Sequence, residues 1–218
     1  MSVIKHKGQR VGVFIDTQNL YHSAKHLYNA RVNFANVLKD AVADRHLIRA
    51  IAYVITTESG EERGFFDALK NMGIETKTKN LQIFAGGSKK ADWDVGLAVD
   101  AIKIAPKLDA VIIASGVGDF MPLVEYLKLN QGCQVEAICF GKSSSLKLKE
   151  SVDEFIDMDN EPEKYLMGHT STREERGPRT ENTNKKRPPS KSSRPINNRI
   201  KKQAPGALSP DLEAMLEE

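Results

Sequence analysis

The sequence predicts an α/β fold built on a mainly parallel, doubly wound sheet. Two continuous apolar runs, at 11–15 and 108–114, fit strands that are buried on both faces, as strands of parallel sheets are. Segments with apolar side chains at helical spacing lie between the expected strands. Strands that alternate with helices in this way indicate βαβ units.

The amino-terminal half opens with the strand that runs into Asp16. Asn33 is expected to cap a helix, and Gly73 to end one, because these residue types favour such positions. Residues 74–79 alternate apolar or β-branched side chains with charged ones, which predicts a strand nearer an edge of the sheet. The elements expected here are strands over 11–15, 47–57 and 74–79, and helices over 18–30, from 34 to 42 and over 59–72.

The carboxyl-terminal half is expected to begin with a helix that opens with acids, which suits the positive end of the helix dipole. Its apolar face is predicted to consist of Val95, Ala98, Val99 and Ile102, which would place Asp94 near the buried side. The elements expected after it are strands over 108–114, 134–140 and 154–158, and helices over 121–129 and 146–152.

The chain changes character at residue 161. Residues 1–160 are predicted to form one domain, and their basic and acidic residues balance. Residues 161–208 hold 12 basic and five acidic residues with few apolar ones, so a disordered basic tail is expected there. Residues 209–218 carry a cap, a proline and Leu and Met at helical spacing, which predicts a short acidic helix.

Cys133 and Cys139 are the two cysteines, and both are expected to be buried, reduced thiols. This composition fits a reducing, cytoplasmic environment. No signal peptide and no apolar stretch approaching the roughly 20 residues of a membrane span is expected.

Three aspartates are candidates for one site. Asp16 and Asp119 follow predicted strands, and Asp94 starts a predicted helix, so all three are expected at the edge of the sheet where α/β proteins bind ligands. A carboxylate there is costly unless it is paired, hydrated or bound to a metal. For Asp16 an alternative stays open, since the same residue could simply cap the helix that follows.

Basic and histidine side chains give weaker signals. His22 and His26 lie four residues apart on a predicted helix. They could bind a metal as a pair, or they could simply be solvated side chains. Lysines flank the Gly86-Gly87 loop, which is either a phosphate contact or a plain turn. The tail either attracts the phosphates of a nucleic acid or serves only solubility. The residues expected to contact RNA are Lys89, Lys90, Lys185, Lys186, Arg187, Lys201 and Lys202.

Three segments, FIDTQNL, KADWDVGLAVDAI and SGVGDFMPLVEYLK, together resemble the NYN domain, in the LabA-like branch of the PIN-like nuclease superfamily. The resemblance covers roughly residues 9–158. It implies a three-layer α/β/α sandwich and an acidic cluster that binds Mg²⁺ or Mn²⁺ and cuts RNA. Asp16, Asp94 and Asp119 match the metal-binding acids of the family, and Asn19 matches the asparagine of its first motif.

One position departs from the family pattern. Val117 stands where the last motif carries an earlier acid, and valine can neither ligate a metal nor orient a water. Two functions are therefore expected: a metal-dependent ribonuclease acting on single-stranded RNA, or a weakened PIN-like domain that binds RNA or protein without cutting. A homodimer and a protein partner bound by the tail are further expectations. Trp93 would lie at the core or rim, or stack on a base. A nucleotide-binding Rossmann protein is disfavoured, because no G-x-G-x-x-G follows the first strand.

Overall fold

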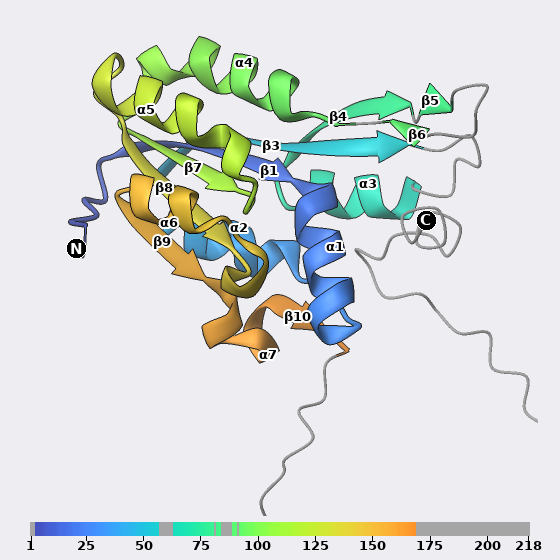
Figure 1. The fold of residues 1–218 in the computed structure, drawn as a ribbon. Coiled ribbons are helices and arrows are strands. Elements are labelled where there is room, and N and C mark those ends of the chain that lie inside the picture. The colour runs from blue at the N-terminus through green and yellow to red at the C-terminus, as the bar shows by residue number, and fades with distance from the viewer. Residues whose placement is uncertain (1–2, 57–62, 81, 84–88, 91, 169–218) are drawn as a thin grey trace, which may run out of the picture.

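The computed structural model describes residues 3–56, 63–80, 82–83, 89–90 and 92–168 (Figure 1). The strands are β1 (Arg10–Asp16), β2 (Arg31–Val32), β3 (His46–Thr56), β4 (Glu75–Asn80), β5 (Gln82–Ile83), β6 (Lys89–Lys90), β7 (Ala110–Ala114), β8 (Gln134–Cys139), β9 (Glu154–Asp157) and β10 (Leu166–Met167). The helices are α1 (Thr17–Tyr28), α2 (Phe34–Val42), α3 (Arg63–Asn71), α4 (Asp94–Ile104), α5 (Met121–Leu129), α6 (Leu146–Ser151) and α7 (Pro162–Tyr165). Short 3-10 helices are η1 (Ala105–Lys107), η2 (Gly118–Phe120), η3 (Gly141–Ser143) and η4 (Met158–Asn160).

Six strands form one sheet in the order β4-β3-β1-β7-β8-β9, and every neighbouring pair in it is parallel. The chain builds outward from β1 to β3 and β4 on one side, and then from β7 to β8 and β9 on the other. The direction of growth therefore reverses between β1 and β7. In doubly wound sheets, ligands bind at the carboxyl ends of the strands beside such a reversal.

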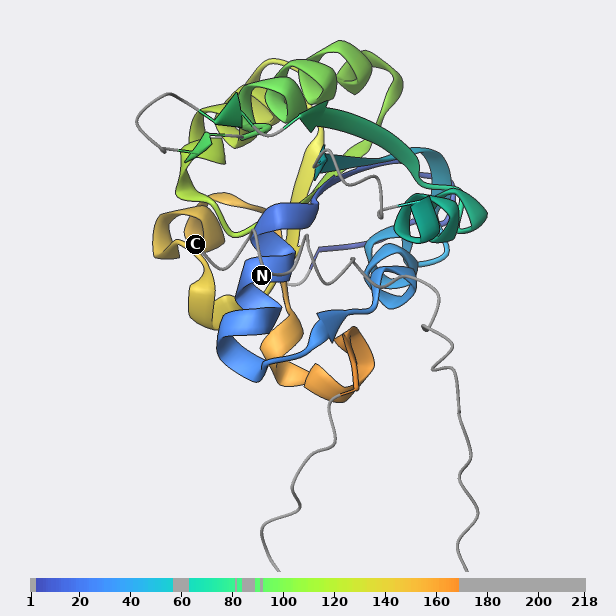
Figure 2. The same cartoon turned by 90° about the vertical axis from the view of Figure 1, so that its right-hand side faces the viewer.

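Helices cover both faces of this sheet (Figure 2). Along β1, Val13 and Ile15 pack with α1, α2 and α3, whereas Phe14 between them packs with α4, α5 and α6. All three side chains are fully buried, because each strand is covered on both sides. The α/β/α sandwich expected from the sequence is confirmed, and the six-stranded sheet is wholly parallel.

The predicted apolar face of α4 is wrong for three of its four residues, and only Ala98 packs partly buried against the core. Val95, Val99 and Ile102 are 73%, 40% and 37% exposed, whereas Leu97 and Ala101 are fully buried against the sheet. Both sets repeat at helical spacing, so periodicity alone does not select one of them. Trp93 packs against the same core as Leu97 and Ala101, and its ring lies so close to Gly96 that a Cβ there would come within 2.5 Å of the ring.

Four short strands, β2, β5, β6 and β10, were not expected from the sequence. β10 pairs antiparallel with β2, and α7 packs beside α2, where the backbone N–H of Asn33 donates to the carbonyl of Tyr165 at 2.7 Å. α7 and β10 lie past residue 160, so the folded chain continues at least to Met167. Residues 169–218, with most of the expected tail and its acidic end, lie outside the described residues. Within the part described, no helix has both the length and the apolar composition of a membrane span.

A buried ion pair joins α2 to the sheet. The guanidinium of Arg45, just after α2, donates to the Glu136 carboxylate of β8 at 2.5 and 3.0 Å, and both side chains are fully buried. Arg45 also donates to the carbonyls of Ala41 and Val42 at the end of α2. Removing one partner of such a pair is strongly destabilising, because the other charge stays buried without compensation.

Replacing Glu136 by Gln should therefore lower the free energy of unfolding by roughly 3–5 kcal/mol, as measured by urea denaturation. Glu75→Gln is the matched control, since its pair with Arg49 is 50% and 40% exposed and should contribute less than about 1 kcal/mol. Equal effects of the two substitutions would contradict this account of the buried pair.

Candidate functional site

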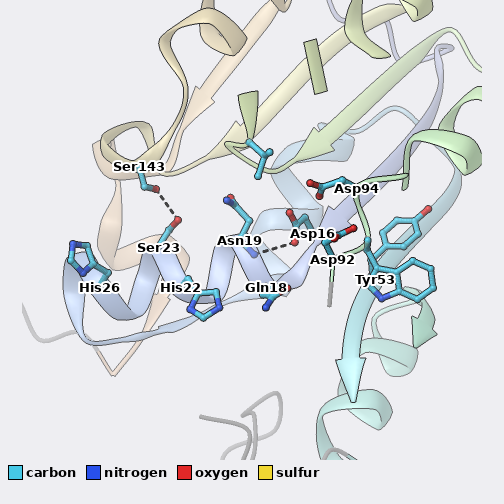
Figure 3. A pocket seen from close by; sticks show the side chains of 12 residues that line it. Asp16, Gln18, Asn19, His22, Ser23, His26, Tyr53, Asp92, Asp94 and Ser143 are labelled. Atoms are coloured by element: carbon cyan, nitrogen blue, oxygen red, sulfur yellow. Dashed lines mark hydrogen bonds between the residues drawn. The ribbon is translucent and has the colours of Figure 1, made fainter. Parts of the chain in front are cut away.

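A pocket of about 450 Å³ opens at the carboxyl end of β1, beside the reversal in the sheet (Figure 3). Its walls come from α1, from the segment that leads into α4, and from the loops after β7 and β8. The lining residues are Asp16, Gln18, Asn19, His22, Ser23, His26, Tyr53, Asp92, Trp93, Asp94, Val117 and Ser143.

Asp16 is the carboxylate at the base of this pocket. One of its oxygens caps α1 by accepting from the backbone N–H of Asn19 at 3.0 Å, and the other accepts from the hydroxyl of Ser115 at 3.1 Å. Burial raises the pKa of Asp16, and these hydrogen bonds only partly offset the effect. Asp16 is therefore a helix cap, as the alternative interpretation held, and also a poorly hydrated carboxylate in a pocket.

Asn19 fastens α1 to the loop after β7. Its side-chain oxygen accepts from the backbone N–H of Gly116 at 2.9 Å, next to the serine that bonds Asp16. Gly116 packs so closely against Ser144 that a Cβ would lie 2.7 Å from the serine hydroxyl. Asn19 thus holds the loop in place, and its amide NH₂ is the part of the side chain that could donate to a ligand in the pocket.

Asp94 faces other acids across the same space. Burial raises the pKa of Asp94, and the charges of Asp16, Asp92 and Asp119 raise it further. The structure therefore brings Asp16 and Asp94 together, with Asp92 beside them on the pocket wall. Asp119 in η2 is exposed and close enough to act on Asp94 through its charge, but it is not among the lining residues.

The donors around Asp16 suit a hard divalent cation, because Mg²⁺ and Mn²⁺ prefer carboxylate and other oxygen ligands. Among the residues that the structure describes, however, no three His, Cys, Asp or Glu side chains stand as a group that could hold a metal ion. A cation held by Asp16 and Asp94 would keep water in its other positions, as Mg²⁺ commonly does. The residues present thus fit a largely hydrated cation.

Aromatic and apolar side chains close the pocket opposite α1. The indole N–H of Trp93 donates to the carbonyl of Val54 at 3.1 Å, and its ring lies 5.5 Å from that of Tyr53. Trp93 is therefore held at the rim of the core. Val117 is partly buried, lines the pocket and packs on the core, so the family's missing acid would have faced this space.

The sequence analysis did not assign several pocket residues to the site: it passed over Asp92, and it named His22 and His26 only as a metal pair or as solvated side chains. Asp92 lies two residues before Asp94 in the same acidic stretch, and that spacing was the available signal. His22 and His26 line the pocket three and seven residues after Asn19, on the same side of α1. The side chains of Lys89 and Lys90 lie outside the described structure, as do Lys185, Lys186, Arg187, Lys201 and Lys202.

Comparisons with known proteins agree with this architecture. The family description of the NYN domain matches residues 10–159. The low amplitude and bright protein LabA of Synechococcus elongatus is 24% identical over 160 residues, which cover 69% of this chain and 84% of LabA. The crystal structure of VPA0982, a protein of unknown function from Vibrio parahaemolyticus, is similar with a TM-score of 0.68 and 29% identity, over 76% of this chain and 100% of that one.

The repulsion around Asp94 predicts a pH-dependent gain in stability when its charge is removed. Because the folded-state pKa is raised, the contribution of Asp94 to stability is present below the unfolded pKa near 4 and is lost as pH rises through the folded pKa. The helix dipole favours an acid here, but the raised pKa indicates that burial and repulsion outweigh it.

Asp94→Asn should therefore increase the free energy of unfolding at pH 7 without added metal, by up to about 1 kcal/mol, since the group is only partly buried. The gain should disappear below about pH 4, where the acids are protonated. Urea denaturation at both pH values measures it, with the exposed Asp67→Asn as the control. A loss of stability in Asp94→Asn at pH 7 would contradict the inferred repulsion.

Proposed function

The chain belongs to the NYN family, and from this premise we propose that it is a metal-dependent endoribonuclease that hydrolyses single-stranded RNA. The observation that carries the proposal is the acidic pocket beside the reversal in the sheet, in which Asp16 and Asp94 both have raised pKa values. Carboxylates that repel one another in a poorly hydrated space favour a cation as their counterion.

In this proposal Asp16 and Asp94 hold Mg²⁺ or Mn²⁺, and Asp119 is the third acid, as the family pattern implies. When bound, the ion supplies charge neutralisation at the phosphodiester and lowers the pKa of a water. Asp92 lies close enough to take part or to accept a proton, since it lines the same pocket. Asn19 keeps the loop after β7 against α1, and its amide orients a phosphate oxygen.

The basic residues outside the pocket bring the substrate to it. An acidic pocket repels RNA, so attraction has to come from elsewhere, and residues 161–208 supply a net charge of +7. Lys89 and Lys90 have the same role of attracting RNA, because they precede Asp92 and Asp94 closely in the chain. This attraction does not depend on base sequence.

A second candidate function is binding of RNA or protein without RNA cleavage. Val117 favours it, because a valine in the pocket wall removes one oxygen ligand from the space where the family places an acid. The domain would then act as an RNA-binding or protein-binding regulatory module, with the tail as its contact to a partner.

Cleavage of a fluorescein-labelled single-stranded RNA in Mn²⁺ or Mg²⁺ separates the two functions. We expect cleavage that EDTA stops and that Asp94→Asn slows at least about 100-fold, because the variant loses a ligand that stabilises charge in the transition state. Asp67→Asn, which removes an exposed acid of α3, should cleave like the wild type. If the wild type binds the RNA but leaves it intact in both metals, the nuclease proposal fails and the binding module stands.

Val117→Asp should strengthen the metal site. The side chain already lines the pocket, so a carboxylate there would add an oxygen ligand beside Asp16 and Asp94. We expect cleavage at low Mn²⁺ to rise about tenfold or more, and Mn²⁺ affinity measured by calorimetry to increase with it. Val117→Asn is the matched control for size without charge. No gain in affinity in Val117→Asp would contradict the role given to this position.

A further inference from the structure

The pocket extends well beyond its acidic end, along one side of α1. Asn19, Ser23 and His26 follow one another at helical spacing, and His22, which Figure 3 shows pointing away from Ser23, also lines the pocket. At 1.5 Å of rise per residue, about 15 Å of helix separates Asp16 from His26. That length exceeds the roughly 3.4 Å rise of one stacked nucleotide. This wall of the pocket is therefore long enough to contact a second nucleotide besides the one whose phosphate lies at the acids.

The two ends of the pocket differ in chemistry. Asp16, Asp92 and Asp94 gather at one end, whereas His22, Ser23, His26 and Ser143 form the other, which has no acidic residue among those that line it. The Ser143 hydroxyl donates to that of Ser23 at 2.7 Å, which ties η3 to α1 across this end. Imidazole rings stack on bases, and hydroxyls and imidazoles bond to base edges or phosphates.

Burial shows how a ligand would have to enter. Ser23 is only 6% exposed and His22 is partly buried, while His26 is exposed at the outer end. Burial lowers the pKa of His22, so at neutral pH this ring is uncharged and offers stacking and a neutral hydrogen bond. A base inside a duplex is stacked and paired, and reaches such groups only after it leaves the helix.

We propose that His22, Ser23 and His26, with Ser143, form a subsite for an unpaired nucleotide next to the phosphodiester that is attacked. This inference rests on the proposed function and deepens it, since it names the groups that select single-stranded RNA. The subsite binds the neighbouring base by stacking on imidazole and by hydrogen bonds in which the Ser23 hydroxyl donates and the Ser143 oxygen accepts. The acids at the other end are left to the cation and the reacting phosphate.

The histidine side chains report directly on this subsite. In the full chain with EDTA, which prevents turnover, the imidazole NMR signals of His22 and His26 should shift when the tetraribonucleotide ACAA, which cannot pair with itself, is added. His46 is the internal reference, because it is exposed at the start of β3, at the opposite end of the sheet. A longer, fully base-paired RNA duplex at the same nucleotide concentration should leave the signals of His22 and His26 in place.

Substitutions test the same subsite through affinity. His22→Ala and His26→Ala should each weaken binding of ACAA at least about fivefold, as loss of a stacking partner does. His46→Ala is the matched control and should bind like the wild type. Because the NMR titration uses the unaltered protein, a folding defect in a variant cannot decide the outcome.

The results separate this subsite from the proposed function. If His22 and His26 respond to ACAA but the protein with Mn²⁺ cuts no RNA, the subsite stands and the nuclease proposal falls. If RNA is cut while both signals stay unmoved by ACAA, the subsite is wrong and the nuclease proposal stands. Equal responses to duplex and single strand would overturn the selection of unpaired RNA.

Discussion

The burial of the Asp16 carboxylate at the carboxyl end of β1 is the constraint on which the site depends. A carboxylate in that position requires hydrogen-bond donors, and the chain supplies them from the start of α1 and from Ser115. Asn19 completes the arrangement by accepting from Gly116, so that α1 and the loop after β7 are fixed to each other through polar groups alone. The position of every other pocket residue on α1 follows from this attachment.

The acids around Asp16 lower the stability of the fold, although the proposed function requires them. Asp16 alone is stabilised as a helix cap, but Asp92, Asp94 and Asp119 add like charge around a partly desolvated space. A fold selected only for stability would replace such acids with neutral residues, as proteins generally do away from functional sites. The body of the fold compensates elsewhere, with two continuous apolar cores on either side of the sheet.

The sequence predicted the fold well where side-chain pattern and environment agree. The strand that runs into Asp16 is buried on both faces, so its composition alone indicates a central parallel strand. The prediction from sequence failed for α4, which carries two apolar stripes. The stripe with Leu97 and Ala101 is the buried one, and Trp93 packs on Gly96 beside it. Asp16 and Asp94 were found because they lie at element ends, whereas His22 and His26 resemble surface residues until the β7 and β8 loops are placed opposite them. Such long-range contacts leave no local pattern.

An acidic pocket and a polyanionic ligand repel each other, so attraction and chemistry have to be separated in space. In this chain residues 1–160 carry no net charge, and the excess of positive charge is confined to residues 161–208. Long-range attraction by such a segment is independent of sequence and weakens with salt. Discrimination between unpaired and paired RNA then has to come from short-range contacts, made by groups that neither attract nor repel RNA at a distance. The neutral imidazole of His22 and the serine hydroxyls at the other end of the pocket have that property. The two-ended pocket is therefore physically consistent: charge brings the ligand near, stacking holds one nucleotide, and the carboxylates remain free for a cation.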